Sequence, residues 1–179
     1  MASISLFNIV FSKESASYYT GELLDGDVVL HLDDSLRFNG IMLRIHGKAK
    51  ASIQIQADNY PRKDKVHTNQ QDWQLQHLST KATEEFIDNA QYIYGDGSPL
   101  TLDSGQYNFP FHFHLPKKDL PTSFEGDRRC YIRYSVTATL DLIDEKDRSV
   151  IQMFTLLARI DVNNPDLQVR IYIQFKLLQ

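Results

Sequence analysis

The segment Gly105-Gln106-Tyr107-Asn108-Phe109-Pro110-Phe111-His112-Phe113-His114-Leu115-Pro116 alternates apolar and polar side chains over most of its length. Apolar side chains occupy the odd positions from Tyr107 to Leu115, and polar ones occupy most of the even positions between them. A period of two places successive side chains on opposite faces of an extended chain. The segment therefore predicts an antiparallel β-strand with one face buried and the other in water.

The same alternation recurs in other parts of the chain, with turn residues between the alternating segments. The longest such segment runs from residue 41 to 56 and has apolar residues at its odd positions. Small residues at three of these positions, Gly47, Ala49 and Ala51, indicate close approach of a facing sheet. Further alternating segments cover residues 28–32, 130–142 and 167–177, and residues 150–162 predict a return strand after the one at 130–142. Short strands separated by turns are typical of a two-sheet β-sandwich or a barrel.

Three regions depart from this pattern. Residues 57–72 are polar and charged and predict a long loop, with a strand resuming at Trp73. Residues 95–99, with two glycines and a proline, predict a turn. The remaining region, residues 80–88, is compatible with a short helix.

Composition excludes several classes of protein. The chain has 179 residues, which suits one domain with its own core. Its net charge is −4, so there is no general attraction to nucleic acid or to an anionic membrane. The single cysteine, Cys130, cannot form an internal disulfide, which fits a reducing compartment. Neither a signal peptide nor an apolar run of roughly 20 residues is present, so the sequence predicts a cytosolic protein.

Four segments, in the same order, resemble the N-terminal domain of the arrestin family, in particular the α-arrestins (arrestin domain-containing proteins). They are Tyr19–Leu30, Arg44–Ala49, Gly105–Pro116 with Ser123–Gly126 and the Tyr134 strand after it, and Ile160–Leu167. The resemblance implies an all-β fold, an antiparallel immunoglobulin-like β-sandwich of arrestin N-domain type, over residues 1–166. Residues 167–179 would then form an additional C-terminal strand or the start of an interdomain segment.

The resemblance also implies a function, that of a non-enzymatic adaptor without a cofactor. Such an adaptor serves the endocytosis and ubiquitin-ligase-linked sorting of membrane receptors or transporters, whose cytoplasmic tails, phosphorylated ones included, it binds. It would work in the cytoplasm, peripheral to the plasma membrane or endosomes, without a nucleic-acid partner. No Pro-Pro-x-Tyr motif occurs in the chain, so a ubiquitin ligase would bind only through regions absent here. The alternative is a self-associating structural β-domain, a homodimer formed through strand 167–179, because an unpaired apolar edge invites pairing.

The candidate partner-binding residues are basic and fall into three groups. The first is a stripe on one face of the strand at 41–56, where a solvated face is the alternative interpretation. The second belongs to the loop 57–72, which the resemblance places where arrestins carry a receptor-probing loop. The third lies near the position of phosphate-sensing lysines in receptor-binding arrestins. In this order the residues are Arg44, His46, Lys48 and Lys50; Arg62, Lys63 and Lys65; and Lys13.

Catalytic and metal sites find little support. His112 and His114 share one strand face, but zinc requires at least three protein ligands. We therefore predict histidines that face solvent and no metal site. Cys130 alternates with apolar residues and is expected to pack in the core; the alternative is an exposed, reactive thiol beside Arg128 and Arg129. The chain lacks Gly-x-Ser-x-Gly, His-Glu-x-x-His and Walker-type motifs, so no catalytic residue is predicted.

Overall fold

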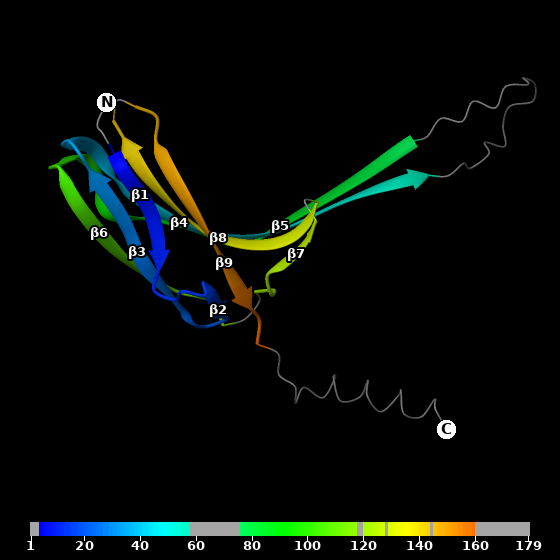
Figure 1. Ribbon diagram of the computed structural model, residues 1–179. Helices are drawn as coiled ribbons and strands as arrows, with labels where there is room; N and C mark the ends of the chain where they lie inside the picture. The colour runs from blue at the N-terminus through cyan, green and yellow to red at the C-terminus, as the bar shows by residue number, and fades with distance from the viewer. Residues whose placement is uncertain (1–3, 58–75, 118–119, 128, 144, 160–179) are drawn as a thin grey trace, which may run out of the picture.

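The computed structural model of the chain describes residues 4–57, 76–117, 120–127, 129–143 and 145–159. For residues 53–57, 76–79 and 127 it describes the main chain alone. All regular structure in these ranges is β-strand (Figure 1). The strands are β1 (Ile4–Phe11), β2 (Ser17–Tyr19), β3 (Leu23–Leu32), β4 (Leu36–Ala57), β5 (Gln76–Leu102), β6 (Gly105–His114), β7 (Phe124–Asp127), β8 (Cys130–Leu142) and β9 (Arg148–Leu157). None of the described ranges contains a helix that could cross a membrane.

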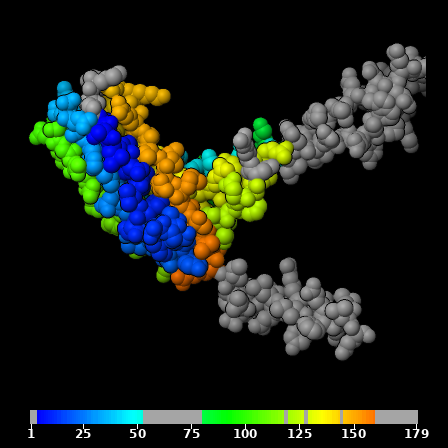
Figure 2. All heavy atoms as spheres, viewed as in Figure 1, coloured from blue at the N-terminus to red at the C-terminus, as the bar shows by residue number. Residues whose placement is uncertain are grey.

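The described strands form two sheets that enclose one core. The smaller sheet has the order β1-β3-β6, and the larger has the order β2-β9-β8-β4-β5, with β7 paired to β8. Strands β1 and β9 lie side by side where the two sheets meet (Figure 2). All pairings are antiparallel except that of β2 with β9, which is parallel. The predicted all-β sandwich is confirmed, and this parallel pair is the feature that the sequence pattern does not show.

Strand β6 confirms the prediction made from its alternation. Phe109 and Phe111 are buried against the core, whereas Asn108 and His112 are exposed. Pro110, in the middle of the strand, is also exposed. A proline has no N–H to donate, and β6 tolerates one because, among the described strands, it lies at the edge of its sheet and pairs only with β3.

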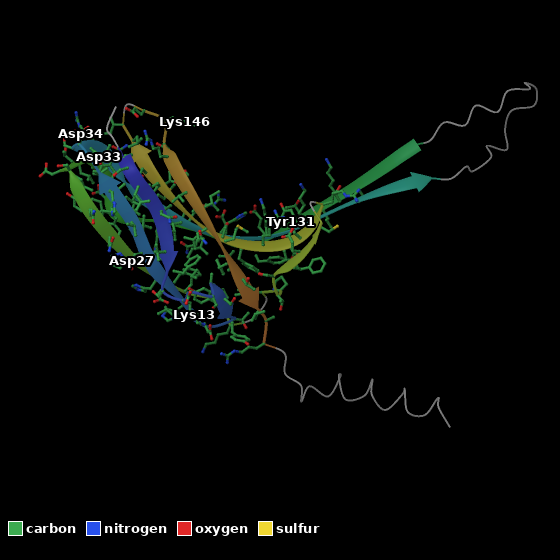
Figure 3. The ribbon with its side chains drawn as sticks, in the orientation of Figure 1. Lys13, Asp27, Asp33, Asp34, Tyr131 and Lys146 are labelled. Atoms are coloured by element: carbon green, nitrogen blue, oxygen red, sulfur yellow. The ribbon has the colours of Figure 1, made fainter. Side chains whose placement is uncertain are left out.

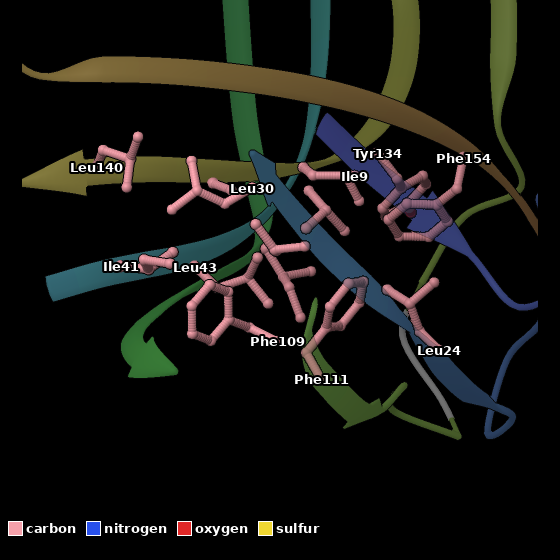
Figure 4. Packing of buried hydrophobic residues seen from close by; sticks show 14 of the residues in the cluster. Ile9, Leu24, Leu30, Ile41, Leu43, Phe109, Phe111, Tyr134, Leu140 and Phe154 are labelled. Carbon is pink, nitrogen blue, oxygen red and sulfur yellow. The ribbon is translucent and has the colours of Figure 1, made fainter. Parts of the chain in front are cut away.

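The core joins side chains from both sheets (Figure 4). Strand β3 contributes Val28 and Leu30, which have no exposed surface. Four aromatic rings cluster at one end of the core, where Phe154 of β9 lies within 5.7–6.2 Å of three other ring centroids. The three other rings belong to Phe11, Tyr18 and Tyr134. This cluster ties β1, β2, β8 and β9 together.

The prediction of a short helix at residues 80–88 is wrong. These residues lie in β5 and pair with β4, from Thr80 opposite Ile53 to Asp88 opposite His46. Their lysine, alanine and glutamate residues are good helix formers, but helix propensity is a weak signal that tertiary pairing overrides.

The predicted turn at residues 95–99 is an excursion within β5, not the end of a strand. Gly40 pairs with Gly95 and Phe38 pairs with Leu100, so four residues of β5 (96–99) lie opposite one residue of β4. Gly95 and Gly97 have φ values of 77° and 91°, a conformation in which side chains are strained. The sequence predicted a turn here, and the structure places it inside one continuous strand.

The small residue at position 47 has a different role from the one expected. A Cβ atom at Gly47 would lie 2.4 Å from Cδ1 of Tyr134. Tyr134 is the partner of Gly47 on β8, in the same sheet, so the close neighbour is not the facing sheet. The Tyr134 ring lies across the glycine, and its hydroxyl donates a hydrogen bond to the Pro121 carbonyl oxygen at 2.7 Å.

Several predictions fall partly or wholly outside the described residues. The strand predicted at 150–162 ends at Leu157, and residues 160–162 are not described. Residue 57 belongs to β4, whereas the rest of the predicted loop and Trp73 lie outside the description. The additional strand at 167–179 also lies outside it, so its role stays a prediction.

We expect stability to fall between about pH 10 and pH 12 because of Tyr134. Burial raises the pKa of this side chain from 10.0 to about 12. Above pH 10 the unfolded chain loses the phenolic proton while the folded chain keeps it, so unfolding becomes easier by up to about 2–3 kcal/mol. Chemical denaturation across this pH range measures the loss, and Tyr134→Phe should make the decline shallower. Identical slopes for the two proteins would contradict the assignment to Tyr134.

Candidate functional site

Strand β4 carries the predicted basic stripe on its outer face. The odd-numbered residues from Ile41 to Gly47 are buried between the sheets, so the even-numbered side chains point outward. The stripe consists of Arg44, His46, Lys48 and Lys50. Its neighbours on β8 are, in the same order, Thr137, Ser135, Arg133 and Tyr131. The alternation of β4 therefore does place the four basic residues on one surface.

Acidic residues from β5 pair with half of this stripe. Arg44 donates two hydrogen bonds to Asp88, at 2.6 and 2.8 Å, and the Nε2 atom of His46 lies 3.3 Å from Oε1 of Glu85. The hydrogen bond from Arg44 lowers the pKa of the Asp88 carboxyl group, and Asp88 raises the pKa of Arg44. No acid interrupts the stripe along β4 itself, but the neighbouring strand supplies two.

The other half of the stripe, Lys48 and Lys50, can still bind an external anion. Within the described part of the chain, neither Lys48 nor Lys50 has an ion pair or a hydrogen bond. Glu85 of β5 lies opposite Lys48 in the strand register, but its carboxylate contacts His46 instead. Beside the two lysines, the Arg133 guanidinium lies 4.0 Å from the centroid of the Tyr131 ring. We call the surface formed by Lys48, Lys50, Tyr131 and Arg133 the basic patch.

Arg133 is held in place by Glu125 of β7. Its Nε atom donates to one carboxylate oxygen at 2.7 Å, and its Nη2 atom donates to the other. This two-pronged contact lowers the pKa of Glu125 and raises that of Arg133. A guanidinium fixed by two parallel hydrogen bonds has a defined orientation, in contrast to the two lysines beside it.

A groove of about 530 Å³ lies next to Arg133. It opens where β8 changes partner, since β9 pairs as far as Tyr134 and β7 begins opposite Ile132. Its lining includes the exposed apolar side chains of Phe124 and Met153, which are 56% and 45% accessible. Sequence reasoning missed this groove, because it results from two strands that meet β8 in succession and has no periodic signal of its own.

Basic patch and groove share Arg133 and so form one surface. A carboxylate or phosphate can accept charge-assisted hydrogen bonds from the patch. An apolar side chain nearby can enter the groove between Phe124 and Met153. The arrangement suits an extended peptide that carries both kinds of side chain.

Lys13 does not belong to this surface. Its Nζ atom donates to Glu22 at 2.7 Å and to the Ser17 carbonyl oxygen at 3.2 Å, and it lies 4.9 Å from the centroid of the Tyr18 ring. The hydrogen bond from Lys13 lowers the pKa of Glu22. Figure 3 shows Lys13 beside β2 and Tyr131 at the far end of β8. The contacts of Lys13 connect the loop after β1 to the residues before β3.

The remaining candidates are placed as follows. Arg62, Lys63 and Lys65 lie outside the described residues. His112 and His114 are exposed on β6, and Cys130 is half-buried at the start of β8 rather than fully packed. Among the described residues, no three histidine, cysteine or acidic side chains come together in a way that could hold a metal ion.

A family profile described as arrestin (or S-antigen), N-terminal domain, matches residues 7–163. The chain belongs to this family. Its match to the mouse arrestin domain-containing protein 4 is 28% identical over 171 residues and covers 92% of this chain and 38% of that protein. For arrestin domain-containing protein 17 of Caenorhabditis elegans the identity is 26%, with 92% of this chain and 37% of that protein covered.

Two further proteins are similar to this chain, one in sequence and one in fold. Human thioredoxin-interacting protein is 27% identical over 164 residues, with coverage of 92% of this chain and 38% of that protein. The fold is also similar to that of Spo0M, a sporulation control protein from Bacillus subtilis, with a TM-score of 0.51 and 16% identity. That likeness covers 98% of this chain and 55% of Spo0M. The chain thus spans less than two fifths of the length of these three curated relatives.

Proposed function

We propose that this arrestin domain is a non-enzymatic adaptor that binds the cytoplasmic tails of membrane receptors or transporters during endocytosis and sorting. The observation that carries the proposal is the joint surface of basic patch and groove, where Lys48 and Lys50 have no ionic partner in the described part of the chain. Family membership supports it, because the relatives are arrestin domain-containing proteins. The natural ligands on this proposal are acidic or phosphorylated tails.

The proposal places the domain in the cytoplasm, at the plasma membrane or at endosomes. A ubiquitin ligase would be recruited by regions outside this chain, since the chain has no Pro-Pro-x-Tyr motif. The proposal keeps the loop residues Arg62, Lys63 and Lys65 as binding residues, because they follow the C-terminal end of β4 in the sequence and β4 carries two lysines of the basic patch.

Charge reversal tests this function. Changing Lys48, Lys50, Lys63 and Lys65 together to glutamate should abolish binding of a fluorescent peptide with a phosphoserine cluster, a loss of about a hundredfold or more at low salt. Fluorescence anisotropy measures the affinity, and that of the natural chain should weaken as salt is added.

Two further variants of this chain show whether the loss of binding is specific to the proposed residues. Lys117 and Lys146 are exposed lysines outside the patch, so a variant with both changed to glutamate should bind the peptide nearly as well as the natural chain. A variant with only Lys48 and Lys50 changed separates the patch from the loop. Unchanged affinity of the fourfold variant in low salt would refute the proposed binding mode.

A further inference from the structure

Strand β5 ends the larger sheet and leaves one edge open. It pairs with β4 along one side, and no described strand pairs with its other side. Figure 1 shows β4 and β5 continuing together as a ribbon beyond the rest of the sandwich. All side chains from Thr80 to Glu85 are exposed. An open edge presents unpaired N–H and C=O groups, which are a template for another strand.

The side chains of this edge divide between the two faces of the ribbon. Lys81, Thr83 and Glu85 lie on the outer face, because their partners on β4 are the outward-pointing residues Ser52, Lys50 and Lys48. Ala82 and Glu84 lie on the other face. Antiparallel strands bring directly opposite residues to the same face, at Cβ separations of about 4.5–5.5 Å.

A second copy of this strand fits the edge in one register better than in its neighbours. Centred on Thr83, antiparallel pairing places Lys81 of each copy opposite Glu85 of the other. Centring on Glu84 or on Glu85 would instead oppose that acid to itself, and like charges directly opposite are destabilising. Centring on Ala82 opposes Lys81 to Thr83 and forms no ion pair between the outer faces.

We infer that two copies of this chain pair antiparallel through the open edges of β5, centred on Thr83, with reciprocal Lys81–Glu85 ion pairs. Glu85 can take part because His46 contacts only its Oε1 atom, which leaves Oε2 for the lysine. The contact involves few residues, so the dimer is weak, with a dissociation constant of about micromolar or higher. This self-association goes beyond the proposed adaptor function and does not depend on it.

Reciprocal charge changes test the register. Lys81→Glu and Glu85→Lys each place like charges opposite one another, so each variant alone should dimerise about tenfold more weakly than the natural chain. Mixing the two variants restores opposite charges at both positions, so the mixture should form a heterodimer about as strong as the natural dimer. Sedimentation equilibrium measures the constants, and native mass spectrometry identifies the mixed species. Lys146→Glu and Glu145→Lys, at the exposed hairpin tip between β8 and β9, are the matched controls and should leave dimerisation unchanged.

A cross-link gives a second test that needs no change of charge. In a Cys130→Ser background, Thr83→Cys should form a disulfide-linked dimer on mild oxidation, whereas Thr101→Cys, at an exposed position of the same strand, should not. The inference is overturned if the natural chain stays monomeric at high concentration, or if both single charge variants dimerise as it does. Loss of the dimer only on deletion of residues 168–179 would overturn it as well, in favour of the C-terminal strand.

Discussion

Phe154→Ala should lower the free energy of unfolding by about 3–5 kcal/mol, the range for truncating a buried aromatic side chain. Phe154 is 4% exposed, and its ring centroid lies 6.2 Å from that of Phe11, 5.9 Å from Tyr18 and 5.7 Å from Tyr134. The substitution removes the transfer free energy of the ring and opens a cavity between rings from three other strands. The contacts with Phe11 and Tyr18 are edge-to-face, and such contacts add about 0.5–1.5 kcal/mol each beyond the area that they bury.

Guanidinium chloride denaturation measures this loss as a lower midpoint with an unchanged slope. Phe124→Ala is the matched control, because Phe124 is 56% exposed at the groove and its truncation leaves no cavity in the core. We expect the control to lower the free energy of unfolding by less than about 1 kcal/mol. Equal losses for the two variants would show that Phe154 does not hold the core together as described.

Gly47→Ala should lower the free energy of unfolding by about 2–3 kcal/mol, which is large for the addition of one methyl group. The new Cβ would lie 2.4 Å from Cδ1 and 2.5 Å from Cε1 of Tyr134, well inside van der Waals contact. The ring cannot easily move away, because its hydroxyl is bonded to Pro121 and the side chain has no exposed surface. The strain therefore falls on the pairing of β4 with β8.

A double-mutant cycle isolates this contact. Tyr134→Leu is itself destabilising, but it replaces the ring that the added methyl group would strike. Adding Gly47→Ala to that variant should therefore cost about 1–2 kcal/mol less than adding it to the natural chain. Additive effects in urea or guanidinium denaturation would place the strain of Gly47→Ala elsewhere.

The alternation of side chains predicted the strands well, because burial of one face leaves a direct trace in the sequence. In β3, β4, β6 and β8, most residues predicted to point inward are buried wherever the strand lies within the sandwich. The pattern fails where a strand leaves the sandwich, since Ala51 keeps the inward parity but is exposed. It also fails in β5, where Lys81 and Glu84 are exposed and are better helix formers than strand formers.

The candidate site was predictable only along one strand at a time. Arg44 and Lys48 share a face of β4, and the sequence shows this. Arg44 is paired with Asp88, whereas Lys48 has no ionic partner among the residues that the structure describes. This difference depends on the register between β4 and β5, which includes an irregularity between Gly47 and Lys48. The groove beside Arg133 likewise depends on where β9 ends and β7 begins. Such contacts between neighbouring strands join distant parts of the chain and leave no local pattern in the sequence.

The parallel pairing of β2 with β9 constrains the order in which the chain can fold. The main-chain N–H of Thr20 donates to the Leu157 carbonyl oxygen at 3.1 Å, and that of Thr155 donates to the Ala16 carbonyl oxygen at 2.8 Å. Residues near the two ends of the described chain are therefore hydrogen-bonded to each other. Closing so large a loop is entropically costly and slow, and contacts this distant in sequence form late. During synthesis on the ribosome, β2 must therefore wait for nearly the whole domain to emerge before it gains its partner. The β1–β3 hairpin can close early, whereas the larger sheet is completed only after translation has passed Leu157.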